Sequence, residues 1–178
     1  MIGLASGKVM LSPYNEKWKK LYNKEEKLLR AALGDLIIDI QHVGSTSIPG
    51  LIAKPIIDIA IGVNTLETGE KCIVPLGRIG YEYKQDAGIP GRHFFAKGSK
   101  DCRTRYLHIE QINSQIWKNH IYFRDYLRKH NYLVYEYARL KVKIADKYKD
   151  DRETYTLEKS VFIQKVMEKA KYEYEINC

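Results

Sequence analysis

The residues whose types and spacing best suit chemistry lie just after a short apolar run. Gly44 and Ser45 form a Gly-Ser pair, and two more hydroxyl side chains, Thr46 and Ser47, follow directly. Glycine lets a backbone approach an anion closely, and the amide and hydroxyl groups beside it can donate hydrogen bonds to that anion. This composition predicts a phosphate-binding loop. An ordinary turn is the structural alternative.

An aspartate in the next apolar run could complete such a site. Asp58 lies within Ile56 to Val63, where an unpartnered carboxylate would be costly to bury. On a strand beside the loop, its carboxylate can hold Mg²⁺, which would bridge to phosphate oxygens. We expect Lys54 to neutralise phosphate charge nearby. A structural salt bridge from Asp58 to Lys54 or Arg92 is the alternative.

A basic cluster follows later in the chain, on a predicted hairpin. It contains Arg92, Lys97, Arg103 and Arg105. Strand alternation places Arg103 and Arg105 on the same face, and the fork of a guanidinium suits phosphate oxygens. We predict that Arg92 and Arg103 bind phosphate. For Lys97 and Arg105, a solvated hairpin surface explains the charge equally well.

The net charge and the spacing of the cysteines limit the classes of protein to which this chain can belong. The 30 lysines and arginines against 22 acids give a net charge of +8, which favours anionic partners such as nucleotides, phosphorylated metabolites or nucleic acid. Cys72, Cys102 and Cys178 have no paired short spacing, which argues against a disulfide framework or a zinc knuckle. No run approaches the length of a membrane span. We therefore expect a cytoplasmic protein without a membrane partner.

Hydrophobic periodicity predicts an α+β fold with one mixed sheet, formed as a single domain over residues 1–178. We expect a first helix from Ser12-Pro13 to Gly34 and a C-terminal layer of three helices packed on the sheet. The other expected elements are strands at 36–43, 56–63, 81–84, 92–96 and 103–111, a helix over 65–80 interrupted at Pro75, and the late helices 113–130, 132–148 and 152–174. Most of the 14 tyrosines fall on helical core stripes, so nucleic-acid binding is less favoured.

The stretch from Gly44 to Asp58 resembles two known patterns. Its Gly-Ser pair is similar to the signature of the nucleotidyltransferase fold. The fuller pattern Gly-Ser-Thr-Ser-x-Pro-Gly-Leu-x-x-Lys-Pro-x-x-Asp resembles the GrpB family. Family-like segments continue nearly to the end of the chain, at 90–98, 103–109, 123–128, 137–141 and 151–159. The resemblance implies a nucleotidyltransferase-like fold that binds a nucleoside triphosphate with Mg²⁺, with Asp58 as a metal ligand.

One position departs from the pattern of the superfamily. A second acid is expected two residues after the first, on the same strand face, and Ala60 stands there instead. Transfer with two metal ions normally needs two or three carboxylates. Glu110, at the end of a strand that could neighbour Asp58, is a candidate second metal ligand. His108 shares the face of Glu110 and is a candidate ligand or base.

These residues support three hypotheses about function. The leading hypothesis is nucleotidyl transfer from a nucleoside triphosphate with Mg²⁺, in which Asp58, His108 and Glu110 do the chemistry and the acceptor is unspecified. The alternative is an inactive module that binds a nucleotide or phosphorylated metabolite, and Ala60 favours it. Nucleic-acid binding through the basic surface ranks third, and it would weaken steeply as salt rises.

Overall fold

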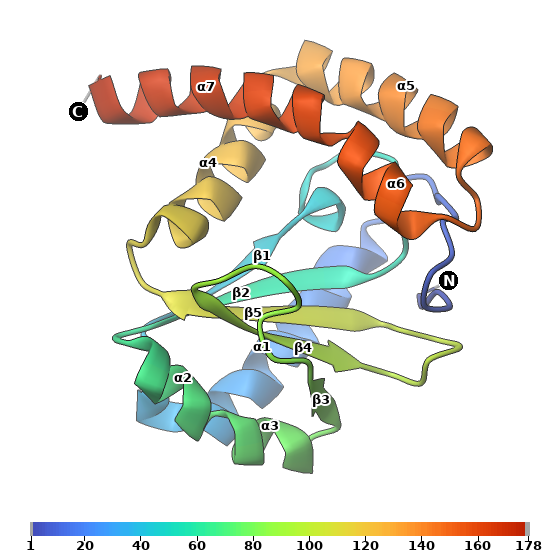
Figure 1. The fold of residues 1–178 in the computed structure, drawn as a ribbon. Helices are drawn as coiled ribbons and strands as arrows, with labels where there is room; N and C mark the ends of the chain where they lie inside the picture. Colours follow the sequence, from blue (N-terminus) through green and yellow to red (C-terminus); the bar gives the residue numbers. More distant parts are fainter. Residues whose placement is uncertain (1, 177–178) are drawn as a thin grey trace.

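A five-stranded mixed sheet separates two helical layers (Figure 1). The structure is a computed structural model and describes residues 2–176. Its helices and strands are, in chain order, α1 (Lys17–Leu33), β1 (Asp39–Val43), β2 (Ile57–Val63), α2 (Leu66–Lys71), α3 (Ile73–Arg78), β3 (Tyr81–Tyr83), β4 (Arg92–Lys97), β5 (Arg105–Gln111), α4 (Gln115–Lys129), α5 (Asn131–Lys147), α6 (Arg152–Glu158) and α7 (Ser160–Ile176). The mixed α+β class and the C-terminal helical layer are confirmed.

The strand order is β1-β2-β5-β4-β3, with β2 and β5 the parallel pair and the other neighbours antiparallel. The predicted hairpin corresponds to β4 and β5. In the register of β2 against β5, Asp58 lies opposite Tyr106, while Glu110 lies opposite Gly62, four residues further along β2. Asp58 and Glu110 therefore stand on neighbouring strands at different levels of the sheet.

The two faces of the sheet differ in chemistry. On one face, alternate residues of the central strands, such as Ile57, Ile59 and Leu107, are fully buried in a core shared with α1 and α3. Because side chains alternate along a strand, Asp58 and His108 project from the opposite face. Helices α4 to α7 cover that opposite face (Figure 1). The sequence thus separates an apolar core face from a polar face that carries the candidate site.

Several predicted boundaries were wrong, each for a local reason. Helix α1 begins at Lys17, because both the amide and the carbonyl of Ser12 pair with Ala53. The break in the 65–80 helix lies at Cys72, between α2 and α3. Pro75 lies instead in the first turn of α3, where a missing amide proton costs no hydrogen bond. The last predicted helix is two helices, α6 and α7, which meet at Lys159.

Two further observations concern the cysteines and the helices. Cys72 is buried and Cys102 is exposed, and both are free thiols, whereas Cys178 lies outside the described residues. Within residues 2–176, no helix has the length and apolar character needed to cross a membrane.

Candidate functional site

A cavity of about 610 Å³ lies between the polar face of the sheet and the C-terminal helices. The Gly-Ser loop and residues of β1, β2, β4 and β5 form one wall, and side chains of α4 to α7 form the other. The polar and charged lining residues are Ser45, Thr46, Lys54, Asp58, Arg92, Tyr106, His108, Asn119, His120, Tyr137, Lys141, Arg152, Tyr155, Thr156 and Lys159. Most of the predicted site residues are therefore brought together in one cavity.

The backbone of Gly44 runs directly past the carboxylate of Asp58. Gly44 has φ +66° and ψ −173°, a conformation that is essentially restricted to glycine. A Cβ atom at this position would lie 2.7 Å from Oδ2 of Asp58. Both the dihedral angles and the close approach require glycine. The Gly-Ser turn thus brings its backbone beside the aspartate carboxylate, as the phosphate-loop hypothesis needs.

Ser47 holds this loop in place and does not line the cavity. Its hydroxyl donates to the Gly44 carbonyl at 2.6 Å, and its own carbonyl accepts a hydrogen bond of 2.7 Å from Nη2 of Arg128. Arg124, one helical turn earlier on α4, donates from Nη1 to the His42 carbonyl at 3.0 Å. Ser47 therefore stabilises the loop, and two arginines of α4 tie the loop and β1 to the helical layer.

Asp58 is the one carboxylate among the described residues that line the cavity, and about a third of its side chain (32%) is exposed. Its nearest basic atom, Nε2 of His108, is 3.7 Å from Oδ1, which is beyond hydrogen-bonding distance. Burial opposes ionisation of Asp58. The neighbouring His108 and the cations Lys54 and Arg152 outweigh that effect and lower its pKa. Asp58 is therefore negatively charged at neutral pH.

Four basic side chains gather around Asp58 without acidic partners of their own: Lys54, Lys141, Arg152 and Lys159. Lys141 donates to the carbonyl of Ile52, and Arg152 donates from Nη1 to the Tyr106 hydroxyl at 2.6 Å. Within residues 2–176, none of the four forms a salt bridge. The cavity thus holds an excess of positive charge.

Burial and mutual repulsion shift the titration of these lysines. Burial, with the nearby cations Arg152 and Lys159, lowers the pKa of Lys54 to about 7. Burial, with Arg152 and against the attraction of Asp58, lowers the pKa of Lys159 to about 8. Burial and the two other lysines also lower the pKa of Lys141 well below its ordinary value. A polyanion in the cavity would reverse these shifts by favouring the protonated forms.

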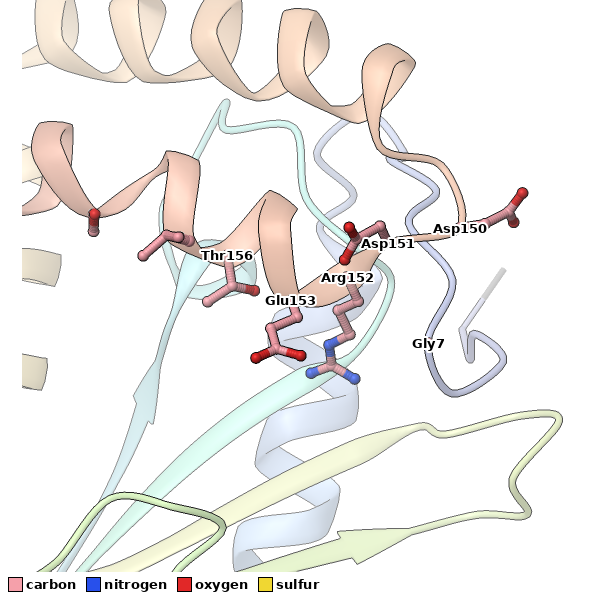
Figure 2. A pocket seen from close by; sticks show the side chains of 8 residues that line it. Gly7, Asp150, Asp151, Arg152, Glu153 and Thr156 are labelled. Atoms are coloured by element: carbon pink, nitrogen blue, oxygen red, sulfur yellow. The ribbon is translucent and has the colours of Figure 1, made fainter.

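Arg152 also marks one approach to the cavity. Figure 2 shows its side chain extending from α6 toward the sheet, beside a groove of about 760 Å³ that Gly7 and Asp150 also line. Arg152 and Thr156 line both the groove and the cavity, so the two spaces adjoin. The acids of the groove lie outside the cavity lining.

Arg92 and His108 complete the strand wall. The Nη1 atom of Arg92 lies 3.1 Å from Nδ1 of His108, and its Nε donates to the Asp86 carbonyl at 2.9 Å. Burial is the main cause that lowers the pKa of His108, so this imidazole is neutral at pH 7. A neutral ring that accepts at Nδ1 carries its proton on Nε2, the atom nearest Asp58.

Glu110 does not meet Asp58 around a shared metal position. Its side chain is fully buried and lies outside the cavity lining, with Oε1 3.0 Å from Nε2 of His120. The register places Glu110 opposite Gly62, two alternating positions beyond Asp58. Glu110, the candidate second metal ligand, therefore lies outside the cavity that Asp58 lines. Asp58 is the acid that faces the cavity.

Arg103 also has a different role from the one expected. It is 5% exposed, and its guanidinium donates to the Gly98 carbonyl at 2.6 Å and to the Glu82 carboxylate at 2.7 Å. These partners hold the far end of the β4–β5 hairpin, away from the cavity. Lys97 and Arg105 likewise pair with the buried Glu25 of α1, at 2.6 and 3.0 Å. Of the predicted basic cluster, only Arg92 lines the cavity.

Four residues with basic side chains line the cavity but were not predicted as site residues. They are His120 of α4, Lys141 of α5, and Arg152 and Lys159 around α6. Arg152 and Lys159 are seven residues apart, about two helical turns, so they share one helix face. That spacing was a usable signal for a basic face. The His42 ring lies on the core side of the sheet, where it stacks on Tyr22 of α1 with ring centroids 4.7 Å apart.

Comparison with known proteins places these features in a family. The family model described as GrpB protein matches residues 8–169. The chain belongs to the GrpB family. A GrpB relative, the glutamate-rich protein GrpB of Alkalihalophilus pseudofirmus, is 39% identical over 94% of this chain and 98% of its own. The crystal structure of the conserved protein GrpB from Enterococcus faecalis superposes with a TM-score of 0.86 at 34% identity, over 93% of this chain and 99% of that one.

A more distant likeness bears on the fold. The structure of Cid1 in complex with its short product ApU matches the GrpB chain with a TM-score of 0.50 and 14% identity, over 74% of this chain and 41% of that one. At this level of identity the similarity concerns the fold alone. The nucleotidyltransferase-like fold expected from the Gly-Ser signature is thereby confirmed.

Gly44→Ala should destabilise the protein more than Gly50→Ala does. Both glycines have positive φ, and each substitution should cost about 1–2 kcal/mol from strain. A Cβ at Gly50 meets no atom within 4 Å, whereas a Cβ at Gly44 collides with Asp58. Urea unfolding of both variants measures the difference. Equal losses would show that the close approach of Gly44 to Asp58 is not rigidly held.

Proposed function

We propose that this GrpB protein binds a nucleoside triphosphate in the cavity, with the phosphates between the Gly44–Thr46 loop and the basic residues of the helical layer. One observation carries the proposal. Five basic side chains line the cavity against a single carboxylate, Asp58. Desolvated like charges repel one another, and a bound polyanion would relieve that repulsion. Three linked phosphates supply the charge that such a cavity lacks.

The cavity also has an apolar part that suits the remainder of a nucleotide. Ile116, Phe123, Ile163 and Met167 line it from α4 and α7. Binding sites for small molecules are typically apolar, with a few charged groups that fix orientation. We infer that the phosphates lie toward Lys54 and Arg152, and that the nucleoside lies toward these apolar side chains.

A single Mg²⁺ fits this arrangement, and a pair does not. Mg²⁺ is usually held by one or two carboxylates together with substrate phosphates. Asp58 is ionised and faces the cavity, so it would be the protein ligand of one Mg²⁺ that arrives with the triphosphate. A second ion lacks a ligand, because Ala60 replaces the second acid and Glu110 is turned to His120. The bound ion would supply part of the neutralising charge, and the lysines and arginines supply the rest.

The leading activity is transfer of a nucleotidyl group to an acceptor that the structure does not identify. For such a reaction, Lys54, Arg92, Arg152 and Lys159 would stabilise the charge that develops on the phosphates, which is the main source of rate in phosphoryl transfer. The alternative is a module that binds a nucleotide without transfer. Ala60 favours the alternative, because it removes the second carboxylate. Release of pyrophosphate in the presence of candidate acceptors would separate the two.

Calorimetric titration with the four nucleoside triphosphates tests the proposal. We expect the wild type to bind at least one of them more tightly with Mg²⁺, and Asp58→Asn to lose that dependence on Mg²⁺. Lys159→Met should weaken binding about 10- to 100-fold, since it removes a charged partner of the phosphates. Lys165→Met, at an exposed position of α7, is the matched control and should bind like the wild type.

Two outcomes of this titration would count against the nucleotide site. One is that no triphosphate binds. The other is that Lys159→Met and Lys165→Met change the affinity equally, which would place the phosphates outside the cavity. Binding that ignores both Mg²⁺ and Asp58 would contradict the role given to Asp58, and would indicate a metal-independent phosphate site.

Nucleotide binding should also take up protons. The pKa of Lys54 is lowered to about 7 and that of Lys159 to about 8, and bound phosphates would raise both values. Above pH 8 the free protein has lost these protons in part, so the affinity should fall as pH rises, by up to about tenfold per pH unit for each lysine that titrates. Titrations in two buffers of different ionisation enthalpy measure the uptake. An affinity that does not change between about pH 8 and pH 9 would contradict the phosphate–lysine contacts.

A further inference from the structure

A second cluster of ligand atoms lies at the edge of the cavity, next to His108. The side chains of His108, Glu110 and His120 each place one ligand atom within 4.8 Å of the others. From these residues we propose a binding site for one divalent transition-metal ion, separate from the Mg²⁺ that accompanies a nucleotide. The proposal does not depend on nucleotide binding, because it rests on the contacts of Glu110 and His120.

The fold builds this cluster from two elements. His108 and Glu110 are two residues apart on β5, so strand alternation directs both toward the helical layer. His120 lies in the first half of α4, within that layer, and its ring contacts both side chains. The rings of His108 and His120 have their centroids 5.0 Å apart. Two imidazoles and one carboxylate thus converge from a rigid strand and a capped helix.

The state of Glu110 is the independent observation that points to a ligand. Its side chain is fully buried, and Oε2 is buried with no hydrogen-bond partner among the described residues. His120 reaches only Oε1, at 3.0 Å. A buried carboxylate oxygen without a partner is costly, since it has lost its water and gained nothing in exchange. A metal ion held by the carboxylate would satisfy that oxygen.

The spacing suits such an ion after the side chains draw together. Ligand atoms at about 2.1 Å from a tetrahedral metal lie about 3.4 Å apart, so separations of up to 4.8 Å need to close by at most about 1.4 Å. Arg92 is the main competitor, because its Nη1 contacts Nδ1 of His108 at 3.1 Å. Metal binding through Nδ1 would displace this contact, whereas binding through Nε2 would require the ring proton to move.

The donor set indicates the class of metal. Imidazole nitrogens favour Zn²⁺, Fe²⁺, Co²⁺ or Ni²⁺, whereas Mg²⁺ prefers oxygen ligands. Three protein ligands also leave coordination positions open. The side chain of His120 is 26% exposed and lines the cavity, so these open positions would face it. A metal here would present water or a substrate group to the same cavity that Asp58 faces.

Titration of the tag-free protein with Co²⁺, followed by visible absorption, tests the site. We expect one Co²⁺ per chain with the spectrum of nitrogen and oxygen ligation, and competition by Zn²⁺. His120→Gln should weaken Co²⁺ binding at least about 100-fold, because even groups behind the ligands contribute 10- to 100-fold to metal affinity. His130→Gln is the matched control: His130 bonds the Tyr126 carbonyl at the other end of α4 and should not affect binding.

Three further measurements make the result decisive. Circular dichroism of each variant checks folding, and Glu110→Gln should lose the Co²⁺ spectrum as His120→Gln does. The Lys159→Met variant should keep the Co²⁺ spectrum while it loses nucleotide affinity, which separates the two sites. If the wild type shows no Co²⁺ spectrum, or if His120→Gln and His130→Gln bind Co²⁺ alike, the proposal is overturned, and Glu110 and His120 form an ordinary buried pair.

Discussion

The imbalance of charge in the cavity is the constraint on which the rest of the site depends. Asp58 alone faces Lys54, Lys141, Arg152 and Lys159, and burial removes much of the water that would otherwise screen these cations. A direct consequence is that Lys54, whose pKa is lowered to about 7, is only partly protonated at neutral pH. Such an arrangement stabilises little by itself, since desolvated charges without partners are unfavourable. It is suited to a partner that brings several negative charges at once.

The helical layer serves this site in two ways. It carries Lys141, Arg152 and Lys159, and through Arg124 and Arg128 it also fixes β1 and the Gly-Ser loop. The position of the loop relative to Asp58 is then limited by Gly44, whose backbone leaves no room for a side chain. The loop amides that we propose to face phosphate and the cations are therefore positioned by one packed unit. A GrpB protein without its last helices would lack most of the charge that defines the cavity.

Elements whose conformation depends mainly on local sequence could be predicted. The apolar run around Asp58 had to be a central strand, and the Gly-Ser-Thr-Ser composition had to be a tight loop, because few other conformations suit those residues. Arg103 shows where this reasoning stops. A guanidinium on a hairpin looks the same in sequence whether it meets phosphate or Glu82, and only the packing decides.

Contacts between residues far apart in the sequence explain the remaining differences between the predicted site and the observed one. Lys97 and Arg105 form salt bridges with Glu25 of the first helix, and nothing in their sequence spacing indicates that partner. Arg152 and Lys159 reach the cavity because α6 and α7 fold back over the sheet. The sequence predicted this helical layer, but no local signal shows which of its side chains meet Asp58. The partner of Glu110 likewise comes from another element, since His120 lies on α4.

The most direct test of the central claim is to map where a phosphate chain binds. Tripolyphosphate, which lacks a nucleoside, can be titrated into ¹⁵N-labelled protein while the backbone amide resonances are followed. The account predicts that the amides of Gly44, Ser45 and Thr46 shift first, together with those of Lys54 and Lys159. Shifts confined to the β4–β5 hairpin around Arg103, or no shifts at all, would contradict it.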